Sequence, residues 1–153
     1  MQLTLLKEKV LEACKARLQT KLNDFDLALA DLMQGASGDS KSSAGDKHET
    51  ARAMMQMEYE KISNQKAECL LQFQQLNRIV PQTVQHINIK NGSLVKTNEA
   101  YLFLSVGIGM IEIASTQVMV LSPQSPLGLI MMNRRLGDTF EFNKKSYRIE
   151  AIA

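Results

Sequence analysis

A heptad repeat of apolar residues occurs twice in the first 80 residues and limits the folds that this chain can adopt. The first repeat places apolar residues every seven positions, at Leu11, Leu18, Phe25 and Leu32, with Leu22 and Leu29 between them. The second repeat places them at Met55, Ile62, Cys69 and Leu76, with Tyr59, Phe73 and Val80 between them. Alternating spacings of three and four residues put all these side chains on one stripe of a helix, as in a coiled-coil seam. Lys15 and Lys66 each interrupt one seam.

A Gly/Ser-rich segment, residues 35–45, separates the two repeats. The first 80 residues contain no proline and are rich in Leu, Lys, Glu, Gln, Ala and Met, which favour helix. Two helices of about 30 residues joined by a polar connection predict an antiparallel hairpin, with its tip at about residues 35–50. At ~1.5 Å per residue each helix would be roughly 45–50 Å long. A rod of this length suits reaching into a partner, and equally suits a spacer or an oligomerisation rod.

The second half of the chain has a different composition. All three prolines lie in residues 81–153, together with most of the Val and Ile. We therefore predict a boundary at Pro81, with a helical hairpin over 1–80 and a second domain over 81–153. In the second domain we expect strands over 86–89, 93–95, 101–106, 117–121, 139–142 and 146–150, a turn at Asn91-Gly92, and a short helix over 127–135. The predicted fold class is α+β, with a small, mostly antiparallel sheet and one short helix packed on it.

Composition excludes several classes of protein. Apolar residues make up 44% of the chain and charged residues 22%, which is typical of a folded globular protein. The net charge of +2 argues against binding nucleic acid through bulk charge, and two cysteines cannot form a secreted disulfide scaffold. Residues 1–8 lack the features of a signal peptide, and the apolar stretch 101–120 is too polar for a membrane helix. We therefore expect a soluble, cytoplasmic protein with no membrane partner.

Two carboxylates, Asp46 and Glu49, lie where the polar connection meets the second helix. Asp followed three residues later by Glu is typical of a capping box, and both charges favour a helix N-terminus. The same spacing puts both carboxylates on one helix face, where they could share a hard cation such as Mg²⁺. Two carboxylates are too few for a tight site, so the other ligands would come from a partner or a substrate phosphate.

The other candidate groups give weaker predictions. Cys14 and Cys69 lie at similar distances from the tip, so they are either buried thiols in the seam or a reversible disulfide. A zinc site is not expected, because the chain has no CxxC motif or paired histidines. His48 and His86 are solitary, and no nucleotide-binding or nucleophile motif is present. We do not expect a self-contained enzyme or a small-molecule substrate.

A set of short motifs near the C-terminus resembles the bacterial Gre transcript-cleavage factors. The motifs are Ser122-Pro123, an apolar helix over 127–132, Arg134-Arg135, Leu136-Gly137-Asp138, an alternating strand, and Tyr147, Ile149 and Ile152. The resemblance covers about 30 residues, and it implies an N-terminal coiled-coil hairpin and an FKBP-like C-terminal domain. It also implies that the C-terminal domain binds RNA polymerase, with Ser122, Pro126 and Gly128 on the polymerase-facing surface, although these three fit equally well as turn residues that the fold requires.

The same resemblance assigns a role to the tip. Gly45-Asp46-Lys47-His48-Glu49-Thr50 keeps the glycine and both acids of the family's tip motif. By resemblance, Asp46 and Glu49 are a catalytic and metal-binding pair that the hairpin inserts into the secondary channel of the polymerase. There they would help to hold an Mg²⁺ shared with the polymerase and stimulate cleavage of backtracked RNA. The factor would activate the polymerase's own hydrolysis, with indirect contact with nascent RNA and DNA.

The tip also departs from the family pattern. The family's threonine-x-x-Gly opening is absent, the Gly/Ser-rich segment 35–45 is longer, Thr50 replaces an asparagine, and Arg52 stands where an acid is expected. Two alternatives therefore stay open beside the cleavage factor. One is a non-cleaving regulator or inhibitor that occupies the same channel, and the other is a coiled-coil adaptor unrelated to transcription.

Overall fold

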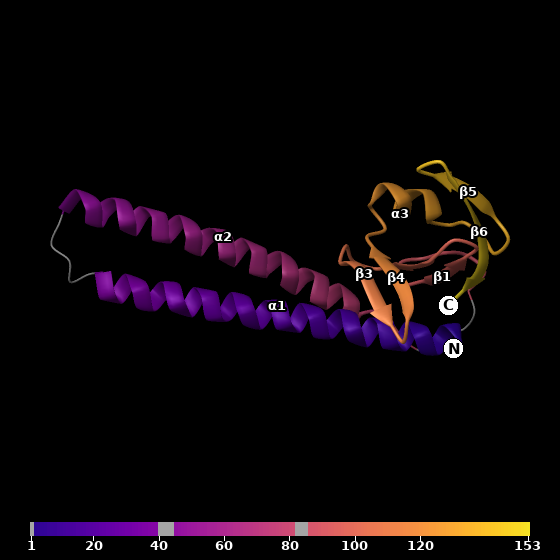
Figure 1. The fold of residues 1–153 in the computed structure, drawn as a ribbon, viewed down its shortest axis with the longest axis horizontal. Helices are drawn as coiled ribbons and strands as arrows, with labels where there is room; N and C mark the ends of the chain where they lie inside the picture. Colours follow the sequence, from indigo (N-terminus) through magenta and orange to yellow (C-terminus); the bar gives the residue numbers. More distant parts are fainter. Residues whose placement is uncertain (1, 40–44, 82–85) are drawn as a thin grey trace. The chain divides into compact units, whose positions relative to one another are not determined.

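The computed structural model describes residues 2–39, 45–81 and 86–153 (Figure 1). Its contacts form two compact units, which we call the hairpin unit, Arg17–Phe73, and the sheet unit, Met1–Ala16 with Gln74–Ala153. This division differs from the boundary predicted at Pro81, because the contacts group both ends of the helical region with the sheet.

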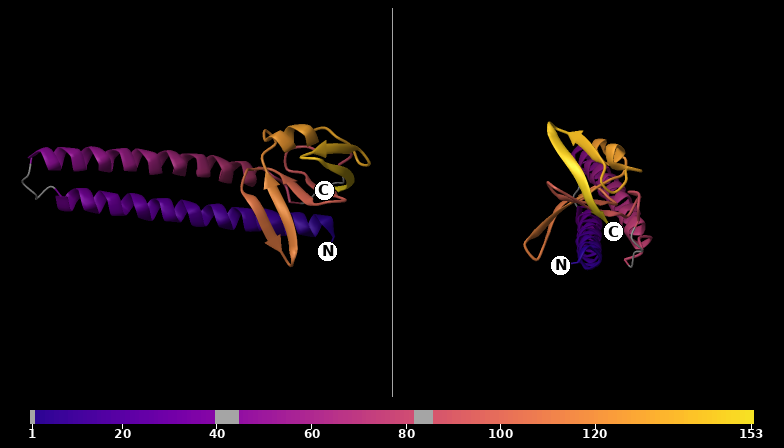
Figure 2. Two further views of the ribbon diagram at one scale, coloured as in Figure 1. Left: turned by 45° about the horizontal axis from the view of Figure 1, so that its top comes forward. Right: turned by 90° about the vertical axis from the view of Figure 1, so that its right-hand side faces the viewer.

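The hairpin unit contains most of two long helices, α1 (Leu3–Asp39) and α2 (Gly45–Asn77). Within this unit Lys66 forms an ion pair with Asp26, and the Cys69 thiol donates to the Leu18 carbonyl oxygen at 3.6 Å. The residue number on α2 rises as its partner's number on α1 falls, so the helices are antiparallel, as predicted. Figures 1 and 2 show them side by side over this unit.

The helices are longer than the sequence predicted. α1 has 37 residues and continues through Asp39, although we expected residues 35–45 to form the connection. α2 has 33 residues and starts at Gly45. At the other end α2 stops at Asn77, and Val80 is 64% exposed, so extending the second seam to Val80 was wrong.

Burial in the hairpin unit follows the predicted seam only in part. Leu18, Leu22 and Cys69 are buried, whereas Phe25, Leu29, Leu32, Met55, Ile62 and Phe73 are half-buried. Tyr59 is 40% exposed although it occupies a seam position. Lys66, which interrupts the second seam, forms a partly exposed ion pair with Asp26. The two helices therefore enclose a narrow core that is most buried at the end containing Leu18 and Cys69.

The sheet unit contains a six-stranded mixed sheet among the described residues, with strand order β3-β4-β2-β1-β6-β5. The strands are β1 (Leu94–Thr97), β2 (Tyr101–Leu104), β3 (Gly109–Ile113), β4 (Thr116–Leu121), β5 (Thr139–Phe142) and β6 (Lys145–Ile152). β2 and β4 pair in parallel, and the other neighbours pair antiparallel. The fold class is α+β, as predicted, and the sheet is mostly antiparallel, with β2–β4 as its parallel pair among the described strands.

Three elements of the sheet unit differ from their predictions. Residues 86–89 are not a strand, and only an isolated bridge joins Asn88 to Arg135. Strand β3 was not predicted, although it pairs with β4 over its whole length and the two form a visible hairpin (Figure 2). Helix α3 (Pro126–Met131) ends four residues before the predicted Arg135. The turn at Asn91-Gly92 is present, with Gly92 at φ 90°.

The main core of the sheet unit lies between the sheet and α3 (Figure 1). Its buried members are Ile89, Val95, Leu102, Leu104, Leu121, Met131, Phe140, Ile149 and Ile152. The first turns of α1 also belong to this unit and bury Leu6, Val10 and Leu11. No helix in the described part of the chain combines the length and apolar character needed to cross a membrane.

Candidate functional site

The two tip carboxylates lie in the first turns of α2. The helix starts at Gly45, so Asp46 is its second residue and Glu49 its fifth. Residues three apart on a helix share one face, so both positions lie on the same side of α2. Glu49 is exposed, and the side chain of Asp46 lies outside the described residues. The helix start places Asp46 inside the first turn rather than at the preceding cap position, where acidic residues still stabilise the helix N-terminus.

Arg52 is the charged residue nearest in sequence after this pair. It follows Glu49 by three positions on α2, and it is exposed. Its guanidinium therefore adds positive charge to the face that carries Glu49. The His48 side chain lies outside the described residues. Among the residues that the structure describes, no group of three or more His, Cys, Asp and Glu side chains is arranged to hold a metal ion.

The Ser122–Gly128 segment forms the tight turn and the N-cap at the start of α3. Ser125 is the N-cap of α3, and its Oγ accepts a hydrogen bond from the Gly128 amide at 3.1 Å. The same hydroxyl donates to the Ser122 carbonyl oxygen at 2.7 Å. Ser122 Oγ accepts from the Gln124 amide at 3.1 Å. Sequence reasoning missed the cap, although Ser followed by Pro at the first helical position is typical of a helix start.

Gly128 is required by packing. A Cβ atom at this position would lie 2.2 Å from the Ser122 carbonyl oxygen and 2.9 Å from the Pro123 Cα. Both neighbours are backbone atoms held by the turn before α3, so neither can easily move away. Ser122 is half-buried and Pro126 is exposed. Of the three positions that the resemblance places on a binding surface, Pro126 is therefore the most accessible.

Several other motif residues stabilise the fold around α3. Arg134 Nε donates to the Ile130 carbonyl oxygen at 2.7 Å, and its Nη1 donates to the Thr139 carbonyl oxygen at 3.2 Å. Its guanidinium carbon lies 5.6 Å from the centre of the Phe140 ring. On strands β5 and β6, the Phe140 and Tyr147 rings stack with centroids 5.1 Å apart. Most of the motif therefore specifies the α3–β5–β6 packing.

The turn before β5 shows the same pattern. Asp138 Oδ2 accepts a hydrogen bond from the Arg135 amide at 2.8 Å. Gly137 has φ 87°, a conformation that favours glycine. Ile149 and Ile152, the last residues of the motif, are buried in the core. The Leu-Gly-Asp part of the motif is thus a turn signal.

Both cysteines are buried and present as thiols. Cys69 donates a weak hydrogen bond to the Leu18 carbonyl oxygen, and burial raises the pKa of its thiol. A thiol with a raised pKa is a poor nucleophile and a slow partner for disulfide exchange. These observations agree with the buried-thiol alternative of the two given above.

Comparisons of the sequence with models of protein families and with curated proteins return no match.

Proposed function

We propose that this chain is a Gre-like factor of RNA polymerase. The sheet unit, taken as an FKBP-like domain, would bind the polymerase, and the joined ends of α1 and α2 would enter its secondary channel. There the factor would stimulate hydrolysis of backtracked RNA by the polymerase. Support comes from the antiparallel helix pair and from the α+β sheet unit with its C-terminal motif.

The observation that carries the proposal is the position of the two carboxylates. Asp46 and Glu49 lie three residues apart in the first turns of α2, at the end where α1 and α2 are joined. Carboxylate oxygens are the ligands that Mg²⁺ prefers, and two of them leave coordination positions for water and for a partner. A second metal ion in a two-metal site stabilises charge on the attacking or leaving oxygen of a phosphodiester. The chain itself would supply the Asp46 and Glu49 carboxylates, and the polymerase would supply the other ligands.

Transcript cleavage in stalled elongation complexes tests this proposal. The wild-type protein should accelerate cleavage in the presence of Mg²⁺. The acceleration by the Asp46→Ala/Glu49→Ala variant should be at least about a hundredfold smaller than that by the wild type, as expected when a metal-holding pair is removed. Glu58→Ala/Glu60→Ala is the matched control, because it removes two exposed carboxylates further along α2. Equal activity of the tip variant and the control would refute the metal-assisting role.

The exposed Arg52 favours a second candidate, a regulator that occupies the channel without stimulating cleavage. A cation one turn from Glu49 lowers the local affinity for Mg²⁺ through charge repulsion. If this candidate is correct, the wild-type protein competes with a cleavage factor but does not stimulate cleavage, and Arg52→Asp gains activity. A protein that fails to bind core RNA polymerase would instead be an adaptor outside transcription.

A further inference from the structure

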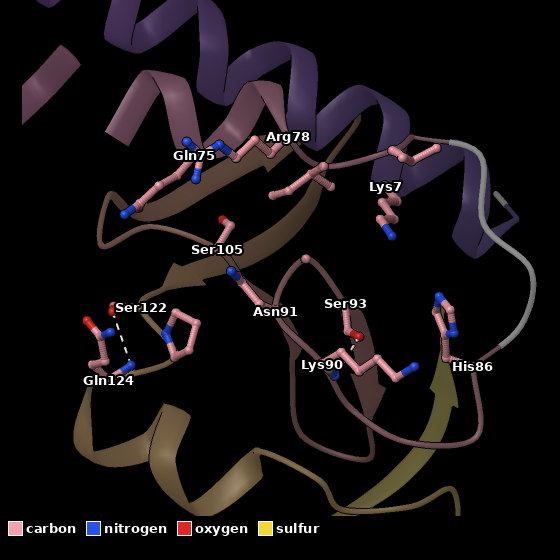
Figure 3. A pocket seen from close by; sticks show the side chains of 14 residues that line it. Lys7, Gln75, Arg78, His86, Lys90, Asn91, Ser93, Ser105, Ser122 and Gln124 are labelled. Atoms are coloured by element: carbon pink, nitrogen blue, oxygen red, sulfur yellow. Dashed lines mark hydrogen bonds between the residues drawn. The ribbon is translucent and has the colours of Figure 1, made fainter. Parts of the chain in front are cut away.

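A polar cavity in the sheet unit concentrates positive charge (Figure 3). It measures about 440 Å³ and lies among the first turns of α1, the end of α2, the loop before β1 and the ends of β2 and β4. Lys7, Arg78 and Lys90 line it together with His86. None of its described lining residues is Asp or Glu. Among its described lining residues the cavity therefore has three cationic side chains and no acidic one.

Lys7 is the least expected member of the cluster. Only 2% of its surface is exposed, and among the described residues it has no ion-pair partner. Burial lowers the pKa of its ammonium group from 10.5 to about 8. A buried ammonium group without a counter-ion is costly, and proteins rarely keep one unless an anion offsets the cost. In Figure 3 the Lys7 side chain points from α1 into the cavity.

A serine hydroxyl supplies a second, independent sign of a ligand. Ser105 is 5% exposed and lines the cavity, yet its Oγ has no hydrogen-bond partner within the described structure. Two neighbouring serines are satisfied: Ser93 Oγ accepts from the Lys90 amide at 2.9 Å, and Ser122 Oγ from the Gln124 amide. Buried hydroxyls without a partner are rare, so Ser105 marks a missing hydrogen-bonding group.

We propose that this cavity binds a small phosphorylated molecule. Lys7, Arg78 and Lys90 would neutralise the phosphate charge, and Ser105 would donate a hydrogen bond to a phosphate oxygen. A phosphate group suits the cavity better than a single carboxylate, because it carries more charge and more acceptor oxygens for this many donors. The proposal rests on the sheet unit alone and is independent of the Gre-like function.

The arrangement of the cations indicates more than one phosphate. In Figure 3 Arg78 enters beside Gln75 on one side, whereas Lys7, Lys90 and His86 lie toward the opposite side. The Ser105 hydroxyl is turned toward the Arg78 side. A cavity of about 440 Å³ has room for a ligand with two phosphates, one toward each side. Inorganic pyrophosphate is the simplest probe of this kind.

Isothermal titration of the full chain with pyrophosphate, inorganic phosphate and adenosine diphosphate tests the site. We expect pyrophosphate and the diphosphate nucleotide to bind at least about tenfold more tightly than phosphate. Tighter binding of adenosine diphosphate than of pyrophosphate would identify the ligand as a nucleotide. Equal affinities for the two would show that the site recognises the phosphates alone. Binding of single-stranded RNA but of none of the three probes would overturn the proposal.

Variants locate the binding. Lys7→Met should weaken pyrophosphate binding about tenfold or more and Ser105→Ala about threefold, in line with the loss of a charge-assisted and of a neutral hydrogen bond. Lys145→Met is the control, since Lys145 is exposed and lies outside this cavity. A titration of the Lys7 side chain by nuclear magnetic resonance should show its pKa rise when pyrophosphate is bound. Equal losses in Lys7→Met and Lys145→Met, or an unchanged Lys7 pKa, would overturn the assignment.

Discussion

The hairpin unit and the sheet unit bury their side chains in very different ways. In the hairpin unit, Leu18, Leu22 and Cys69 are the buried apolar residues among those described. The sheet unit buries a core of strand, helix and loop residues that includes Phe103, Leu104, Met131 and Ile149. Stability per residue follows apolar burial, so the sheet unit holds most of the folding free energy. The hairpin unit depends more on helix propensity and on a narrow seam.

This contrast agrees with a division of tasks under the proposed function. A unit with a full core suits a fixed binding surface, because its side chains are held in place by close packing. A helix pair with a narrow core can carry polar and charged residues on most of its surface. Asp46 and Glu49 lie in such a region, where replacing them should cost little stability.

Gly128→Ala should destabilise the sheet unit the most. The added Cβ would lie 2.2 Å from a backbone oxygen that the turn before α3 holds in place. We expect a loss of about 4 kcal/mol or more in the free energy of unfolding, measured by urea denaturation. Gly107→Ala is the matched control, because nothing lies within 4 Å of a Cβ there. Similar stabilities of the two variants would contradict the packing of α3.

Leu18→Ala should destabilise the hairpin unit by about 3 kcal/mol, as expected for a fully buried leucine. Hydrogen exchange should show the loss of protection in the helices of this unit, while the strands stay protected. Leu27→Ala should cost little, because Leu27 is 66% exposed on the same helix. If the strands lost protection to the same extent as the helices, the two units would not be separate in stability.

Lys7→Met should stabilise the sheet unit, with a pH dependence that identifies the cause. The Lys7 pKa is about 8 in the folded chain and 10.5 as its ordinary value. Below pH 8 both states carry the charge, and the folded state bears its burial cost of up to about 3 kcal/mol. The cost declines between pH 8 and 10.5 and vanishes above that range. Thermal unfolding of both proteins at pH 7 and 10.5 measures this, and an equal difference at both pH values would contradict it.

Lys66→Ala should have the smallest effect. The Lys66–Asp26 ion pair is partly exposed, and such pairs contribute about 0.5 kcal/mol. A double-mutant cycle with Asp26→Ala in urea denaturation isolates the pair. A coupling energy above about 2 kcal/mol would mean that the hairpin relies on charge rather than on its narrow apolar seam.

The heptad repeats predicted the helix pair, and the buried residues Leu18, Leu22 and Cys69 all occupy predicted seam positions. Glycine and serine have low helix propensity, so the sequence suggested that α1 would end near residue 35. In the structure α1 continues through Asp39. Strand β3 was missed for a local reason. The turn that joins it to β4 uses Ala114 and Ser115 at φ 48° and 67°, a conformation normally indicated by Asn or Gly.

Two other features depend on contacts between distant segments. Residues 86–89 alternate like a strand, but Ile89 exchanges backbone hydrogen bonds with the loop after α3, at Asn133 and Arg134. The cationic cavity combines Lys7 from α1, Arg78 from just after α2, and Lys90 from the loop before β1. These three residues lie far apart in the sequence and follow no pattern that would predict their proximity. The tip carboxylates could be singled out from the sequence because Asp46 and Glu49 lie within one turn of the same helix.

A competition experiment asks whether one part of the chain binds RNA polymerase while the tip carboxylates act there. Stalled elongation complexes would receive a fixed amount of wild-type protein and increasing amounts of Asp46→Ala/Glu49→Ala. We predict that transcript cleavage falls toward the unstimulated rate as the variant displaces the wild type, because the variant keeps the binding surface. Cleavage that stays constant at a large excess of the folded variant would contradict this account.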